Sequence, residues 1–232
     1  MLHKFTYFEP IHIHSFIFFT ILSIIIISIP FFMKKDYKGI FTKALGFFIL
    51  FAKVFDIWYR IAIEKENWIF TIPLNLCNIS AIVIGIFLII RRNTLFNLAY
   101  FWFTGAILAV ILPGIVTYRT PFYIYVFMGL HFLEIMAVIY AFIHLDVRVT
   151  KKGLYFALIG YLTLCLVGSI VNYSTGTNYM FTYDYIIPAV NFIEPFILYV
   201  VLLISLFMLS MILTYLPFLH IDNEEIEEKS IS

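Results

Sequence analysis

The stretch from His12 to Phe32 reads HIHSFIFFTILSIIIISIPFF and contains no Asp, Glu, Lys or Arg. A helix needs about 20 mainly apolar residues to cross the hydrocarbon core of a bilayer, so this stretch predicts a transmembrane helix. Six more apolar runs follow at Phe41–Ile63, Ile72–Ile90, Leu95–Val116, Phe122–Ile143, Leu154–Val171 and Ile186–Tyr215. We therefore expect an all-α, polytopic membrane protein, built as a single bundle of seven transmembrane helices.

The composition agrees with one membrane domain. The chain has 232 residues, of which 63% are hydrophobic and 12% are charged, and its net charge is +1. We assign residues 1–218 to the seven-helix domain and 219–232 to a short acidic cytoplasmic tail. The near-neutral charge gives no indication of nucleic-acid binding. Cys77 and Cys165 both lie inside predicted spans and make neither a metal-ligand cluster nor a structural disulfide, so we predict no metal and no cofactor.

The basic residues predict an orientation. The connections after the first, third and fifth spans contain Lys34, Lys35, Lys38, Arg91, Arg92, Arg148, Lys151 and Lys152. The other side has Lys4, Arg60, Lys65 and Arg119, and none between residues 172 and 185. Loops rich in lysine and arginine stay in the cytoplasm. We therefore expect the N-terminus outside and the C-terminus inside.

The polar residues within the spans gather at one depth. At 1.5 Å per helical residue, the outer half of the bundle receives a common set of polar side chains. Its members are His14, Lys53, Asp56, Asn75, Cys77, Asn78, His131, Glu134, Asn191 and Glu194. The inner halves of the same spans are almost wholly apolar. Because an ionisable side chain in hydrocarbon is costly unless it is enclosed with partners, this pattern predicts one polar cavity open toward the outer leaflet.

Most of these residues also have a structural interpretation. Lys53 and Asp56 are three positions apart and can neutralise one another on one helix face. Asn75 and Asn78 can join neighbouring helices by hydrogen bonds. A thiol such as Cys77 is a nucleophile only where a neighbouring group takes its proton or stabilises its charge.

Three further features of the sequence concern the predicted cavity. His131 and Glu134 share a helix face, and Glu134 can orient the imidazole or pair with Lys53. The loop 172–185 is the longest connection, and we expect it to lie over the cavity as a lid. Pro188 and Pro195 flank Asn191 and Glu194 and predict a kink in the seventh span.

Several motifs resemble one family in order along the chain. The string PLNLCNISAI at 73–82 resembles the signature at the start of the third span in the YwaF-like bacterial integral membrane proteins. The likeness continues with Phe8 and His14, YFWFTGA at 100–106, LPG at 112–114, GLHF at 129–132, NYMF at 178–181 and YLPF at 215–218. The resemblance implies a multi-pass protein of the bacterial cytoplasmic membrane.

That family is distantly related to a eukaryotic transmembrane acyltransferase that moves fatty acyl groups between phospholipids through a cysteine–histidine pair. The resemblance implies that Cys77 is the nucleophile, that His131 is its base, and that the partners are membrane lipids with a phospholipid or lysophospholipid substrate. In such a mechanism Asn75 and Asn78 offer amide donors to an oxyanion. The chain departs from the pattern of this family at Asn75, where its members usually carry a histidine.

Two other functions remain open on the sequence. In a transporter or substrate-binding membrane subunit, Lys53, Asp56, Glu134 and Glu194 contact a small polar ligand or protons, and Cys77 is incidental. In a non-catalytic membrane protein, the same polar residues only join the helices.

Overall fold

The computed structural model describes residues 2–187 and 190–219. Its helices are α1 (Pro10–Ser28), α2 (Lys35–Ala62), α3 (Leu76–Ile90), α4 (Asn93–Trp102), α5 (Thr104–Ile111), α6 (Phe122–His144), α7 (Lys151–Thr175) and α8 (Phe196–Tyr215). Two short strands, β1 (His3–Lys4) and β2 (Thr117–Tyr118), pair antiparallel at one end of the bundle. The predicted all-α class is confirmed, apart from this small pairing. From residue 220 onward, the predicted acidic tail lies outside the described residues.

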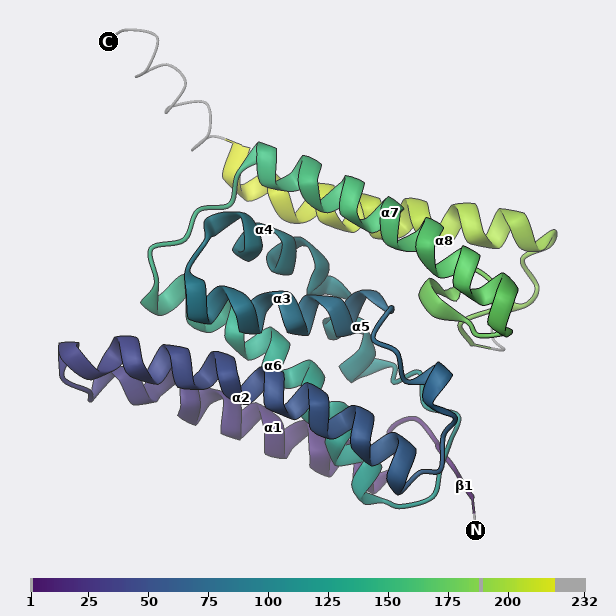
Figure 1. The fold of residues 1–232 in the computed structure, drawn as a ribbon, viewed down its shortest axis with the longest axis horizontal. Coiled ribbons are helices and arrows are strands. Elements are labelled where there is room, and N and C mark those ends of the chain that lie inside the picture. Colours follow the sequence, from purple (N-terminus) through teal and green to yellow (C-terminus); the bar gives the residue numbers. More distant parts are fainter. Residues whose placement is uncertain (1, 188–189, 220–232) are drawn as a thin grey trace, which may run out of the picture.

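The helices lie side by side in one elongated bundle (Figure 1). α1 and α2 form one edge, α7 and α8 form the opposite edge, and α3 to α6 lie between them. α3 packs against α2, α4 and α6, so it occupies the centre of the bundle. The residues at the start of α3 are therefore surrounded by other helices.

Within residues 2–187 and 190–219, five helical segments are long and apolar enough to cross a membrane. They are Pro10–Phe31, Asn93–Ile111, Phe122–His144, Lys151–Thr175 and Phe196–Phe218. α3 is equally apolar but shorter, and α2 is long but carries Lys53, Asp56 and Arg60. The chain is a polytopic membrane protein.

Most predicted spans have other boundaries in the structure, and three of these differences affect the region of the site. The fourth is divided into α4 and α5 by a turn at Phe103. The third begins at Leu76, after Pro73. The seventh begins only at Phe196, because Pro195 is its N-cap and the residue before a proline is disfavoured in helical conformation. The kink predicted at Pro195 is therefore wrong, since this proline starts the helix, and Pro188 lies outside the described residues.

The outer helices expose most of their surface. Of its nineteen residues, α1 buries His12 and Ser15, and the large apolar side chains of α1 and α8 are mainly exposed. The core is formed instead by fully buried side chains of α2, α3, α4 and α6, namely Ile49, Ile84, Leu88, Phe96, Phe101, Met136 and Tyr140. Exposed isoleucine, leucine and phenylalanine on the outer helices match a surface that faces lipid.

Two glycines allow α2 and α3 to approach closely. A Cβ atom added at Gly46 would lie 2.6 Å from the carbonyl oxygen of Gly85 and 2.9 Å from Cγ1 of Ile89. Small residues at a helix contact in membranes let the two backbones come together in this way. The contact sets the distance between the two helices that carry Lys53 and Cys77.

We expect Gly46→Ala to be less stable than Gly39→Ala by about 1–3 kcal/mol, because the new methyl group overlaps a backbone oxygen. Gly39 lies on the same helix with nothing within 4 Å of an added Cβ, so both changes alter helix propensity equally and only Gly46→Ala adds a clash. Thermal unfolding of the detergent-solubilised proteins measures the difference. Equal midpoints for the two variants would contradict the close contact.

Candidate functional site

A cavity of about 710 Å³ opens between α2, α3, α5, α6 and α8, at the end of the bundle near β1 and β2. Its polar lining includes five of the residues singled out in the sequence, Asp56, Asn75, Cys77, Asn78 and His131. A recess of about 10 Å³ adjoins it and is lined by Lys53, Cys77, Asn78, Ala81, Leu130, His131 and Glu134. The predicted clustering of these polar residues is present in the structure.

Cys77 lies in the first turn of α3, and its side chain is partly exposed, whereas Cys165 is buried. The sulfur packs over α5 at Gly105, where an added Cβ would lie 2.9 Å from Sγ. Any larger residue at that position would push against the thiol. The sequence TGA at 104–106 therefore provides the space in which the cysteine faces the cavity.

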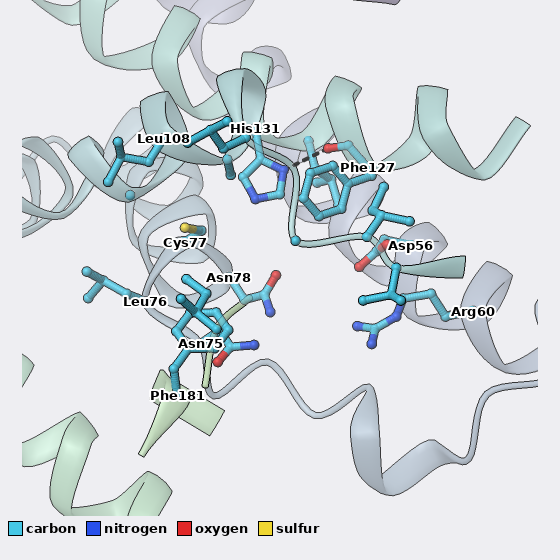
Figure 2. A pocket seen from close by; sticks show the side chains of 18 of the residues that line it. Asp56, Arg60, Asn75, Leu76, Cys77, Asn78, Leu108, Phe127, His131 and Phe181 are labelled. Carbon is cyan, nitrogen blue, oxygen red and sulfur yellow. Dashed lines mark hydrogen bonds between the residues drawn. The ribbon is translucent and has the colours of Figure 1, made fainter. Parts of the chain in front are cut away.

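His131 is on α6, across the cavity from α3. Its Nδ1 donates a hydrogen bond to the carbonyl oxygen of Phe127 at 2.8 Å. A carbonyl oxygen only accepts, so Nδ1 carries the proton and, in the neutral ring, Nε2 is an acceptor. Figure 2 shows Nε2 facing the cavity on the side where Cys77 lies. Among the described residues no hydrogen bond joins Cys77 and His131. The two side chains therefore line the same cavity without bonding to each other directly.

A buried cation links α2 to α3. The Nζ atom of Lys53 donates to Oδ2 of Asp56 at 2.6 Å and to Oδ1 of Asn78 at 2.7 Å. Lys53 is 3% exposed and Asp56 4%. The ion pair predicted from their spacing is confirmed, and it is also an interhelical contact, because Asn78 supplies the second acceptor. Asp56 is neutralised by Lys53, while Arg60 donates to Glu66.

Glu134 is fully buried on α6. Ser80 and Lys53 are the polar side chains around it, but within residues 2–187 and 190–219 neither carboxyl oxygen has a hydrogen-bond partner of good geometry. The predicted contacts with His131 and Lys53 are therefore wrong as direct hydrogen bonds. The Nδ1 atom of His131 donates instead to the Phe127 carbonyl oxygen of the same helix. The Lys53 ammonium group donates instead to Asp56 and Asn78.

Three predicted members lie elsewhere. His14, Asn191 and Glu194 are exposed and do not line the cavity. Asn191 and Glu194 precede α8, because the helix starts after Pro195. The histidine of α1 that is buried in the bundle is His12. Its Nε2 donates to the carbonyl oxygen of Val110 at 2.9 Å, and its Nδ1 accepts from the Phe8 amide. His12 thereby joins α1 to α5.

The loop after α7 covers part of the cavity. It begins at Gly176, whose φ of 68° ends the helix, later than the predicted start at residue 172. Asn172 bonds both backbone polar groups of Tyr179, at 2.7 and 2.9 Å, and Oδ1 of Asn75 accepts the Met180 amide at 2.8 Å. The Tyr179 hydroxyl also donates to the Ile69 carbonyl. These bonds hold Met180 and its neighbour Phe181 against the cavity.

Charged residues at the cavity mouth were not predicted as part of the site. Glu64 accepts from the amides of Arg119 and Thr120 at 2.5 and 3.1 Å, which ties the loop after α2 to the loop before α6. Arg60 and Arg119 line the same mouth. The sequence reasoning gave Glu64 no role and used Arg119 only to assign the sides of the membrane, because their pairing depends on contacts between distant loops.

No group of three or more His, Cys, Asp or Glu residues that could hold a metal ion occurs in the described part of the chain. The cavity lining offers one thiol, one imidazole, amide groups and, at the mouth, charged side chains that include Arg60, Glu64 and Arg119.

The fold and the cavity define a polytopic membrane protein that encloses a polar site within its helices. The profile of the TMEM164 family matches residues 7–215, and the chain belongs to this family. A protein of Treponema pallidum (strain Nichols), described as an uncharacterized protein, is 32% identical over 198 residues, which is 85% of this chain and 83% of that relative. No solved structure matches. The narrower resemblance to YwaF-like proteins stays a prediction.

The Lys53 contacts predict a stability test. Lys53→Met leaves the buried Asp56 without its partner and should destabilise the protein by about 3–5 kcal/mol. The double variant Lys53→Met/Asp56→Leu should recover most of this loss, because an apolar pair can replace a buried ion pair at little cost. Thermal unfolding in detergent measures both effects.

Lys43→Met is the control for this test, since Lys43 is exposed on the same helix and its loss should change stability by no more than about 0.5 kcal/mol. A double variant as unstable as Lys53→Met alone would show that the two charges do not act as a matched pair.

Proposed function

We propose that this protein transfers fatty acyl groups of membrane lipids through a thioester on Cys77. The observation that carries the proposal is that the Cys77 thiol and the acceptor Nε2 of His131 line one cavity within a membrane helix bundle. Membrane lipids are the expected partners, with a phospholipid as acyl donor and a lysophospholipid or water as acceptor.

The chemistry follows the usual course of nucleophilic catalysis. His131 Nε2 takes the proton from the thiol, and the thiolate attacks the carbonyl carbon of a lipid ester. When the carbon–oxygen bond breaks, His131 returns the proton to the departing lysolipid oxygen, and the acyl group remains on Cys77 as a thioester. Acylation of the acceptor then regenerates the thiol.

The start of α3 supports the charged intermediate of this reaction. The first backbone N–H groups of a helix have no acceptor within the helix, and Cys77 is in this first turn. The N-terminal end of a helix also favours negative charge. Amide N–H groups of Asn75 and Asn78 line the same cavity, so several donors are available to an oxyanion beside the sulfur.

The apolar wall of the cavity suits an acyl chain. It is formed by Leu108 and Leu112 near α5 and by Leu203 and Phe207 of α8. Other leucine and isoleucine side chains of α8 are exposed on the bundle surface, so this wall lies beside the lipid-facing side of the protein. A lipid would place its chain along α5 and α8 and its ester near Cys77.

We further propose that seven segments cross the membrane, with α4 and α5 acting as one span. α2 crosses as well, because its 28 residues extend about 42 Å and its inner charges Lys53 and Arg60 are paired. The basic loops support an orientation with the N-terminus and the cavity outside and the C-terminus inside. The bacterial relative supports a bacterial cytoplasmic membrane as the location.

The two ends of α7 test this orientation. In a Cys77→Ser/Cys165→Ser background, Ser174→Cys should react with a membrane-impermeant maleimide added to intact cells, whereas Lys152→Cys should react only after permeabilisation. Both positions are exposed, so the difference reports the side of the membrane. The opposite labelling pattern would reverse the orientation.

The thioester is the direct test of function. Purified protein incubated with phospholipid should gain the mass of one acyl group on Cys77, and hydroxylamine should remove it. Cys77→Ser should abolish the modification, and His131→Ala should slow it by about 10²–10⁴-fold, the usual contribution of a general base. Intact-protein mass spectrometry measures each rate.

Cys165→Ser is the matched control, because Cys165 is a buried thiol away from the cavity, and it should retain full modification. An unmodified wild-type protein across a broad panel of lipids would contradict the acyl-transfer function. Tight binding of a small polar ligand that survives Cys77→Ser would favour a transporter or binding subunit instead.

A further inference from the structure

Glu134 is a buried acidic residue to which the proposed reaction gives no role. It lies next to the reacting groups, because it lines the recess together with Cys77 and His131. Its carboxyl group is fully buried, and neither oxygen makes a hydrogen bond of good geometry among the described residues, because the nearby Ser80 hydroxyl donates to the Ala99 carbonyl oxygen instead. A buried polar group without a hydrogen-bond partner is destabilising, so a partner for Glu134 beside the thiol would stabilise the protein.

The recess has the size and the chemistry of a site for one water molecule. A water needs about 10–15 Å³ of accessible space and two to four polar partners, and the recess provides about 10 Å³. Acceptors are the two oxygens of Glu134 and Nε2 of His131. Donors are the amide of Asn78 and the third hydrogen of the Lys53 ammonium, whose other two bond Asp56 and Asn78.

Cys77 is also in a position to meet such a water, because it lines both the recess and the large cavity. A lipid acyl chain needs the large cavity, whereas Glu134 lines only the small recess. The acyl chain of a Cys77 thioester would therefore lie in the large cavity, and its thioester group would also border the recess. A lysolipid acceptor does not fit into a space of about 10 Å³, but water does.

We infer that Glu134 holds the water that cleaves the Cys77 thioester, so that the protein releases the acyl group as a free fatty acid. This inference rests on the proposed function and specifies its acceptor. The water donates one hydrogen bond to Glu134 and one to His131 Nε2. Its oxygen bonds to the thioester carbon, and the carbon–sulfur bond breaks. His131 takes the water proton and returns it to the sulfur, which leaves a carboxylic acid and a free thiol.

The test separates formation of the thioester from its hydrolysis. The full-length protein is placed in nanodiscs of phosphatidylcholine and phosphatidylglycerol in heavy-oxygen water. The Cys77 thioester and the isotope content of released fatty acid are followed by mass spectrometry. Wild-type protein should release fatty acid with one heavy oxygen. In Glu134→Leu the thioester should form at a similar rate but persist about 10- to 100-fold longer, because the water is no longer positioned.

Two more variants distinguish loss of the water site from misfolding of the Glu134→Leu protein. Ala81→Val narrows the recess without changing Glu134 and should prolong the thioester in the same way. Glu194→Leu removes an exposed acid outside the cavity and should behave as wild type. Hydroxylamine should cleave the accumulated thioester in every variant, since it replaces only the missing water.

Each outcome decides between the two proposals. A thioester that passes only to added lysophospholipid, with no heavy oxygen in free fatty acid, overturns the water site and leaves acyl transfer intact. Equal rates of thioester hydrolysis in wild type, Glu134→Leu and Ala81→Val also overturn the water site. If the wild type forms no thioester at all, the proposed function fails and the water site fails with it.

Discussion

The ammonium group of Lys53 is the constraint on which the rest of the site depends. A cation buried in a membrane bundle must be matched by nearby acceptors, and here they come from Asp56 on its own helix and Asn78 on α3. Because both acceptors must lie next to the ammonium group, their bonds set the register of α3 against α2. The contact between Gly46 and Gly85 sets the distance between these two helices. Because Cys77 is adjacent to Asn78, the same bond fixes the thiol at the cavity wall.

Much of this arrangement is predictable from hydrophobicity and spacing. Apolar runs locate the helices, and the common depth of Lys53, Cys77 and His131 predicts that they meet. The predictions fail where a local backbone preference competes with hydrophobicity. Asn191 and Glu194 continue an apolar run, but Pro195 excludes a helix there, so these two residues remain at the surface. Hydropathy does not detect this, because it takes no account of backbone conformation.

The direction of a side chain is a second limit on sequence reasoning. The sequence predicted His14 as the inward residue of α1, and only the packing of α1 against α5 shows that His12 bonds Val110 while His14 is exposed. Similarly, the spacing of His131 and Glu134 places them on one face, but it does not show that His131 donates to Phe127 or that Glu134 lacks a partner. Partner choice depends on helices that are distant in sequence.

The asparagine at position 75 can be interpreted physically from its contacts. Asn75 is the N-cap of α3, and its Oδ1 accepts the Met180 amide, so the side chain holds the loop that covers the cavity. The tautomer of His131 is fixed independently by Phe127, and the space for the thiol is provided by Gly105. The contact that Asn75 makes is therefore with the loop that covers the cavity, whereas the imidazole and the thiol are positioned by other residues.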